Sequence, residues 1–174
     1  MSRVPRWVSS RAKLSDCGRY RYWLERVWDE EAASVVFVML NPSTADHEHD
    51  DPTIRRCMAF ADQAGFGAIE VVNLFALRAT DPNELRDAVD PVGPENDDYL
   101  STVCSARSVC FAWGTPKRQL VRTRIASVLG LLNGDGEQAG RWWCLGACAD
   151  GSPAHPLYRP SYVSFQPWPV VGEG

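Results

Sequence analysis

The stretch that most constrains the fold is an uninterrupted apolar run that ends in a polar turn. Residues 35–40 read Val-Val-Phe-Val-Met-Leu, and Asn-Pro-Ser-Thr follows directly at residues 41–44. A continuous β-branched run of this length predicts a strand buried on both faces, as in a parallel sheet. Ligands of open α/β sheets bind outside the carboxyl ends of the strands. The turn at residues 41–46 is therefore the first place where we look for chemistry.

Further strands and helices alternate along the rest of the chain. The patterns predict strands at residues 20–28, 69–75, 108–114 and 141–146, and helices at residues 52–64, 94–106 and 117–132. This alternation implies right-handed crossovers and a mainly parallel sheet. We expect the aromatic segment 20–28 to turn at residues 29–34 and to pair with residues 35–40 as an antiparallel hairpin. The expected fold is α/β, with three layers (αβα) around a central, mainly parallel four-stranded sheet plus an N-terminal antiparallel strand.

Length and composition indicate one ordinary globular domain. The chain has 174 residues, of which 45% are hydrophobic and 23% charged. Because we find no internal repeat and no linker, we expect a single domain over residues 1–174. Its parts are a basic lead-in (1–16), a core (17–160) and a peripheral tail (161–174).

The same composition narrows the compartment and the partners. No apolar run approaches the roughly 20 residues of a membrane span, and the first residues lack the apolar segment of a signal peptide. We therefore expect a cytoplasmic protein with no membrane partner. The six cysteines include no Cys-x-x-Cys pair, so we interpret them as reduced core thiols and expect no cofactor. The net charge of -4 gives no global attraction to nucleic acid.

Short motifs stand at four predicted strand ends, in a fixed order. They are Met39-Leu40-Asn41-Pro42-Ser43, Val71-Val72-Asn73-Leu74 with the later Asp81-Pro82, Ala112-Trp113-Gly114, and His155-Pro156. In this order and spacing they resemble motifs of the uracil-DNA glycosylase superfamily. More closely, residues 17–160 resemble an uncharacterised bacterial and phage domain family. Its marks here are Leu-Asn-Pro-Ser-Thr-Ala-Asp (40–46), Asp-Asp-Pro-Thr-Ile-Arg-Arg-Cys (50–57) and Val-Asn-Leu-Phe-Ala (72–76).

The resemblance implies a DNA glycosylase-like enzyme. Such an enzyme hydrolyses the N-glycosidic bond of a damaged or modified base that is flipped out of DNA. Asn41 would orient the attacking water, Asp46 would polarise it or stabilise the sugar cation, and His155 would donate a hydrogen bond to the departing base. Two departures concern the substrate. Met39 stands in place of the first glycine of the first motif, and Leu157 replaces a serine whose hydroxyl would hold a DNA phosphate.

Further residues are assigned to the base and to the phosphates. The amide of Asn73 suits a Watson–Crick edge. Pro42, Ser43 and Phe75 complete the expected base-binding set. Arg55, Arg56 and Arg78 are the expected phosphate-binding set, the first two because backbone amides at a helix N-terminus favour anions.

Other interpretations of the same residues stay open. Asn41 can serve only an Asx turn and Asp46 only a helix cap, and Trp113 can be a core residue. The segment Asp46–Asp51 also offers oxygen and imidazole donors for a metal, although a solvated acidic loop is the commoner explanation. Two other functions remain alternatives to the glycosylase. One is a catalytically inactive module that binds bases or nucleic acid, and the other is a hydrolase of free modified nucleosides or nucleotides.

Overall fold

The structure is a computed structural model that describes residues 4–168 except 82, 106 and 134–140. Pro82 of the second motif and residues 169–174 of the expected tail therefore lie outside the described part. The strands are β1 (Ser9–Leu14), β2 (Arg21–Val27), β3 (Ser34–Met39), β4 (Ala68–Asn73), β5 (Val109–Phe111), β6 (Trp142–Cys144) and β7 (Gln166–Pro167). The helices are α1 (Pro52–Gln63), α2 (Asn83–Asp87), α3 (Asn96–Cys104) and α4 (Gln119–Leu132), with a 3-10 helix η1 (Pro156–Tyr158).

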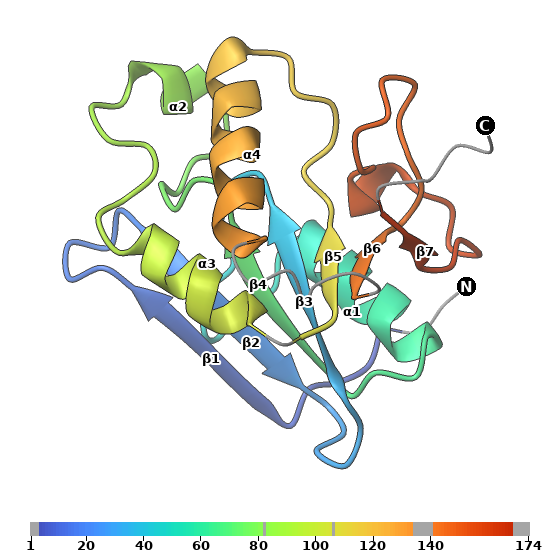
Figure 1. Cartoon of the computed structure of the whole chain (residues 1–174). Coiled ribbons are helices and arrows are strands. Elements are labelled where there is room, and N and C mark those ends of the chain that lie inside the picture. The colour runs from blue at the N-terminus through green and yellow to red at the C-terminus, as the bar shows by residue number, and fades with distance from the viewer. Residues whose placement is uncertain (1–3, 82, 106, 134–140, 169–174) are drawn as a thin grey trace.

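One mixed sheet contains all the described strands, in the order β1-β2-β4-β3-β5-β6-β7 (Figure 1). Three neighbouring pairs are antiparallel, namely β1/β2, β2/β4 and β6/β7. The other three pairs, β3/β4, β3/β5 and β5/β6, are parallel. The expected central sheet of four mainly parallel strands with one added N-terminal strand is therefore wrong. Among the described residues the sheet has seven strands, because β1 and β2 extend it on one side and β7 extends it on the other.

The expected hairpin between residues 20–28 and 35–40 is also wrong. Strand β2 pairs with β1 and β4. After α1 the chain returns parallel to β3 and takes the position beside it as β4, so β2 lies outside β4. The backbone N–H groups of Trp28 and Asp29 both donate to the carbonyl oxygen of Gly67, which fixes the turn after β2 against the start of β4. Residues 9–14 of the expected basic lead-in form β1.

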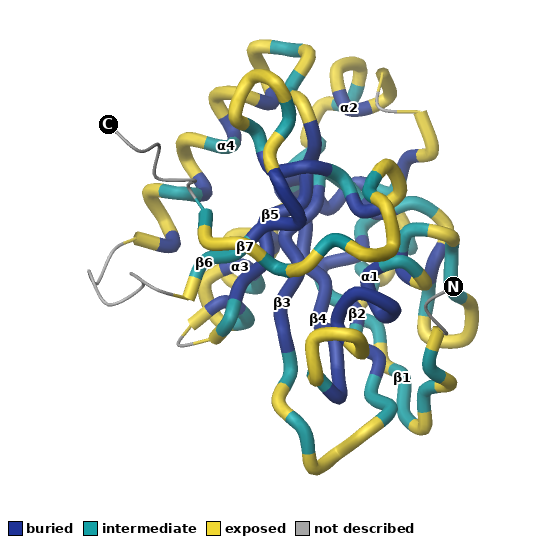
Figure 2. The backbone as a smooth tube through the Cα atoms, turned by 90° about the vertical axis from the view of Figure 1, so that its right-hand side faces the viewer, coloured by how far each residue is buried: buried dark blue, intermediate teal, exposed yellow. Residues whose placement is uncertain are grey.

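Helices cover both faces of the sheet, which explains why the apolar run in β3 does not alternate with polar residues. Val35, Phe37 and Met39 pack in a core with α1, while Val36 and Val38 pack in a second core with α3 and α4. Figure 2 shows β3, β4 and β5 as the most deeply buried part of the chain. No helix among the described residues is long and apolar enough to span a bilayer.

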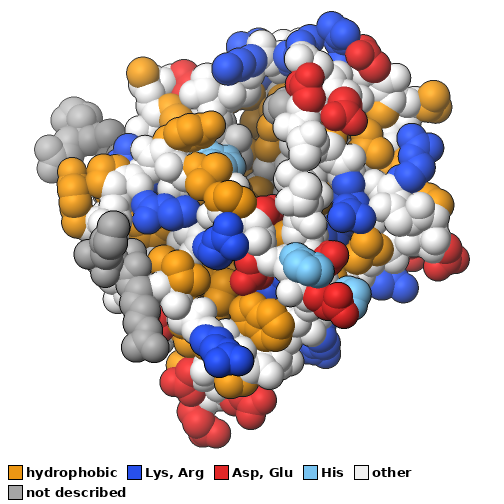
Figure 3. Space-filling model, turned by 180° about the vertical axis from the view of Figure 1, so that it is seen from behind, with side chains coloured by type: hydrophobic (Ala, Val, Ile, Leu, Met, Phe, Trp, Pro, Cys, Tyr) orange, Lys and Arg blue, Asp and Glu red, His pale blue; other side chains and the backbone are white. Residues whose placement is uncertain are grey.

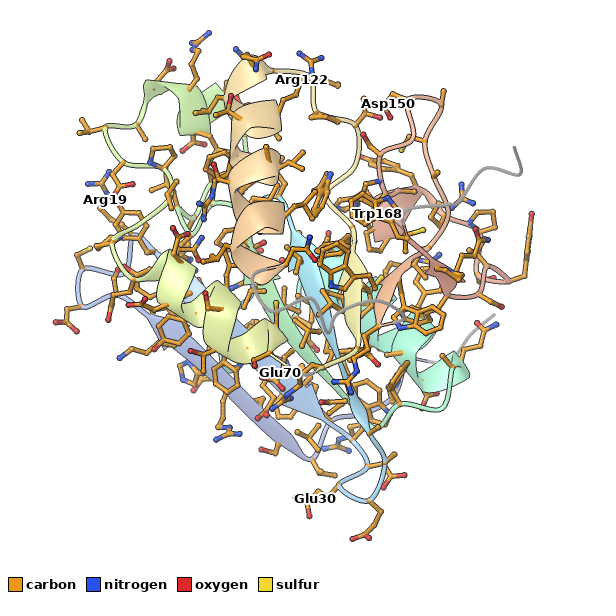
Figure 4. All side chains as sticks on the ribbon, in the orientation of Figure 1. Arg19, Glu30, Glu70, Arg122, Asp150 and Trp168 are labelled. Atoms are coloured by element: carbon orange, nitrogen blue, oxygen red, sulfur yellow. The ribbon has the colours of Figure 1, made fainter. Side chains whose placement is uncertain are left out.

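The topology sets the position of the candidate site. From β3 the chain passes through α1 to β4 on one side, whereas β5 lies on the other side of β3. The carboxyl ends of the parallel strands β3, β4, β5 and β6 all lie on one side of the molecule (Figure 1). In Figure 4, Asp150 in the loop after β6 lies on the side of these carboxyl ends, and Glu30 in the turn before β3 lies at the opposite end of the strands. Crevices outside the carboxyl ends, where the strand order reverses, are the usual ligand sites of such sheets.

Candidate functional site

A cavity of about 370 Å³ lies at the carboxyl ends of the parallel strands. Four strand ends contribute to it, together with the beginning of α1. The contributions used below are Asn41 after β3, Asn73 at the end of β4, Trp113 after β5, His155 after β6, and Asp51 before α1. Residues that are more than a hundred positions apart in the chain therefore line the same cavity.

Four of the residues expected from the sequence meet in this cavity. Asn41, Ser43, Asn73 and His155 all line it. They converge because each stands at or after the carboxyl end of a parallel strand, and those carboxyl ends lie on the same side of the sheet.

Asp46 does not line the cavity. Its Oδ1 accepts hydrogen bonds from the backbone N–H groups of Glu48 (2.8 Å) and His49 (2.9 Å). These bonds, with that from Glu48 the largest cause, lower the pKa of Asp46 to about 2. The carboxylate therefore closes a turn within its own loop instead of facing the other candidates.

Asp51 is the carboxylate that lines the cavity, and the sequence interpretation missed it as a site residue. It caps α1, because its Oδ1 accepts a hydrogen bond from the backbone N–H of Ile54 at 2.9 Å. An acid directly before a proline is a recognisable start of a helix, so the capping role of Asp51 before Pro52 is visible in the sequence. What the sequence could not show is that the first turn of α1 faces the ends of the strands.

Two expected base-binding residues are part of the packing. Pro42 is buried, and its carbonyl oxygen accepts a hydrogen bond from the backbone N–H of Ala79 at 3.0 Å. Phe75 is fully buried in the core beneath α3 and α4. Neither residue lines the cavity, so neither is placed to stack on a ligand there.

The three expected phosphate-binding arginines also lie outside the cavity. Arg55 is exposed and donates to the backbone carbonyl oxygen of Asp50 at 3.0 Å. The guanidinium of Arg56 lies 4.6 Å from the centroid of the Phe60 ring. Arg78 donates to the backbone carbonyl oxygen of Gly18 at 3.3 Å. Each of these arginines therefore contacts another part of the protein outside the cavity.

The two asparagines in the cavity are held differently. The Nδ2 group of Asn41 donates to the backbone carbonyl oxygens of Pro42 (3.1 Å) and Ala79 (2.8 Å), which leaves its Oδ1 as an acceptor. Asn73 is 1% exposed, and its Nδ2 has no hydrogen-bond partner among the described residues. Its backbone carbonyl oxygen accepts from the side chain of Asn96 at 2.9 Å. A buried amide nitrogen without a partner costs about 1–3 kcal/mol, which a ligand acceptor would offset.

His155 is held as a neutral donor. Burial lowers its pKa below the usual 6.5, and the nearby charge of Asp51 opposes that shift in part. The backbone N–H of Leu157 donates to Nδ1 at 3.3 Å, so in the neutral ring the proton resides on Nε2. The imidazole can therefore donate from Nε2 at neutral pH without carrying a charge.

Arg21, at the start of β2, is a second cavity residue that the sequence interpretation missed. It is 2% exposed, and its side-chain hydrogen bond runs from Nη1 to the backbone carbonyl oxygen of Ala45 at 2.8 Å. Burial lowers its pKa from 12.5 to about 10, with the charge of Asp51 acting in the opposite direction. The group therefore remains a cation at neutral pH. The sequence did offer one signal for this residue, because a charged side chain within an aromatic strand segment is unusual for a core position.

Arg26, on the same strand, fixes the loop after β3. Its Nε pairs with Asp50 at 2.7 Å, and Nη2 donates to the backbone carbonyl oxygens of Asp46 and His49. Asp50 also accepts a hydrogen bond from Trp7 at 3.1 Å. These contacts hold the polar turn and its acids from the side of β2, so the loop's shape depends on a strand that the sequence placed elsewhere.

The proposed metal site in residues 46–51 has no geometric support. In the part of the chain that the structure describes, no three His, Cys, Asp or Glu side chains are grouped so that they could hold a metal ion. His47, Glu48 and His49 are exposed on the loop.

The fold and the site define a mixed-sheet protein with helices on both faces and a polar cavity at its parallel strand ends. The chain belongs to the DUF1643 family, described as "Protein of unknown function (DUF1643)", whose profile matches residues 21–157. The prediction of an uncharacterised domain family is thereby confirmed. Searches of curated proteins and of solved structures found no match. The resemblance to the uracil-DNA glycosylase superfamily receives no support from these comparisons.

Proposed function

We propose that this protein hydrolyses the N-glycosidic bond of a damaged or modified base flipped out of DNA. The observation that carries the proposal is the convergence of Asn41, Asn73 and His155 in one cavity with Asp51. The cavity volume of about 370 Å³ lies within the range of about 300–1,000 Å³ that is usual for ligand sites. Four motifs in the order of the glycosylase superfamily point to the same reaction.

The reaction needs a donor at the base and a reader of its edge. When the bond breaks, negative charge develops on the base, and the Nε2–H of His155 would donate to a base carbonyl oxygen. A neutral donor suits this role, because burial keeps the imidazole uncharged before the reaction. The unpartnered Nδ2 of Asn73 would bind an acceptor on the base edge. Loss of one such donor typically costs about 10²–10³-fold in rate.

The sugar side of the bond needs an anion and a positioned water. The Oδ1 of Asn41 would accept a hydrogen bond from the attacking water, because both N–H groups of this amide are already used. The carboxylate of Asp51 would stabilise the cationic sugar or accept the water's proton. Asp51 takes the role that the sequence interpretation gave to Asp46, whose carboxylate is used within its loop.

A hydrolase of free modified nucleotides is the second candidate, and Arg21 favours it. A buried cation in the cavity wall suits a ligand that brings its own anionic group, and the net charge of -4 does not favour a DNA surface. Figure 3 shows basic and acidic side chains interspersed over the face that it draws. The catalytically inactive binding module remains the third candidate, and turnover separates it from the other two.

The test is incubation with a panel of modified-base oligonucleotides, followed by alkali cleavage of abasic sites. A parallel arm measures base release from the matching free nucleosides and nucleotides. Base release that falls at least about 100-fold in Asn41→Ala and His155→Ala supports the proposal. Gln63→Ala, on the exposed end of α1, is the matched control. Normal rates in both cavity variants would place the reaction elsewhere, and no release in either arm would leave a binding module.

A further inference from the structure

Arg21 has no role in the reaction as derived, although burying it is costly. Isolated charges lose their hydration on burial and are usually paired or hydrogen-bonded in return. Arg21 is 2% exposed, and none of the ion pairs between described residues includes it. Strongly perturbed ionisable groups in a cleft are candidates for functional residues.

Arg26 shows what a satisfied buried arginine on this strand looks like. It is fully buried, its Nε pairs with Asp50, and its other nitrogens donate to backbone carbonyl oxygens. In Arg21, the bond from Nη1 to Ala45 leaves Nε and Nη2 unused within the described residues, and Nε is buried without a hydrogen-bond partner. The Nε and Nη2 groups form the edge by which arginine binds a carboxylate or phosphate with two parallel hydrogen bonds.

A second unused donor belongs to the same cavity. The Nδ2 group of Asn73 is buried without a partner, and its side chain lines the cavity as Arg21 does. The backbone N–H of Arg21 donates to the carbonyl oxygen of Ala76 at 2.9 Å, so Arg21 is attached to the segment just after β4, which ends at Asn73. Two unpartnered donors on neighbouring segments indicate a ligand with acceptor atoms.

We propose that Arg21 and Asn73 form a subsite for an oxyanion of the substrate. The group is either an acidic substituent on the base or the phosphate of a free mononucleotide. The inference deepens the proposed function, since it uses the same cavity. The Nε and Nη2 groups of Arg21 bind two oxygens of the anion, and the amide of Asn73 binds one. The charge of Asp51 favours the cationic form of Arg21, against the lowering of its pKa by burial. Asp51 is itself held at the start of α1, because it accepts a hydrogen bond from the backbone N–H of Ile54.

Binding to the intact wild-type chain tests the subsite without relying on any variant. Calorimetry compares two pairs of probes, orotate with uracil and uridine 5′-monophosphate with uridine, and inorganic phosphate is a fifth probe. A charge-assisted bidentate contact should favour the anionic member by about 10- to 100-fold. Preference in the first pair assigns the anion to the base, and preference in the second pair assigns it to the phosphate. Equal affinity within both pairs overturns the proposal.

Variants then assign the preference to the two residues. Arg21→Met and Asn73→Asp should each remove the preference for the anionic probe, because the first deletes the cation and the second adds a repelling carboxylate. Arg26→Met is the matched control, since it deletes a buried arginine of β2 that does not line the cavity. Circular dichroism confirms that each variant is folded. A preference that survives in folded Arg21→Met or in folded Asn73→Asp contradicts the proposal.

The outcome is separable from that of the proposed function. An anion preference that depends on Arg21, without base release from any substrate, leaves the subsite standing and removes the glycosylase. Base release without any anion preference keeps the reaction and removes the subsite.

Discussion

At the scale of single residues, burial decides which chemistry each polar side chain can perform. His155 is kept neutral by burial, whereas the cation of Arg21 persists because the pKa of a guanidinium starts so high. Asn73 keeps a donor that no protein group uses. None of these states follows from residue type alone, because each depends on what covers the side chain.

The lowered pKa of His155 predicts a pH dependence of stability. Its pKa is 6.5 in the unfolded chain and lower in the folded protein. Between these two values the unfolded state binds the proton and the folded state does not, so stability falls as the pH drops below 6.5. Above 6.5 this residue contributes no dependence. The urea midpoint of the wild type should therefore fall more from pH 7.5 to pH 5 than that of His155→Gln, and equal falls would contradict the assignment.

Some of the site could be predicted from residues because it depends on strand ends. Asn41, Asn73 and His155 follow apolar runs, and parallel topology brings such ends together. The choice between Asp46 and Asp51 could not be predicted, because both acids stand in one polar loop. Arg26 on β2 fixes that loop through the carbonyl oxygen of Asp46, 20 positions further along the chain. Which acid faces the cavity then depends on how the loop and the start of α1 pack against the strand ends.

At the scale of elements, local signals located the helices well and strand pairing poorly. The predicted helix 52–64 corresponds to α1 (Pro52–Gln63), because a capping acid and a proline at the first position mark its start. The pairing of β2 with β4 brings Leu24 against Val71. No turn signal specifies so distant a partner, which is why the expected hairpin was wrong.

The contact between the turn after β2 and the start of β4 predicts an intolerant glycine. A Cβ at Gly67 would lie 2.1 Å from the carbonyl oxygen of Asp29 and 2.8 Å from the Cβ of Ala32. Because the first of these atoms is backbone, Gly67→Ala should lower the free energy of unfolding by roughly 3 kcal/mol. Gly65→Ala is the matched control, since its φ is +86° but its surroundings are open. It should cost only about 1 kcal/mol in urea unfolding. Equal losses would mean that the turn and β4 are not in contact.

At the scale of the whole molecule, the two edge strands β1 and β7 are the part of the sheet that the sequence pattern did not reveal. In β1 the residues are exposed or half-buried, and β7 has 2 residues, so neither carries the apolar run that marks a buried strand. The buried middle of the sheet was predictable because both of its faces are covered. The fold places a polar cavity where its parallel strands end, and the proposed reaction takes place in that cavity.

Single-turnover base release from the best substrate tests that claim most directly, with Asp51→Asn and Asp46→Asn compared side by side. The two acids stand five positions apart, but only Asp51 lines the cavity. We expect the rate to fall by about 10²-fold or more in Asp51→Asn and to change less than about 3-fold in Asp46→Asn. The opposite result, with Asp46→Asn inactive and Asp51→Asn normal, would contradict the account.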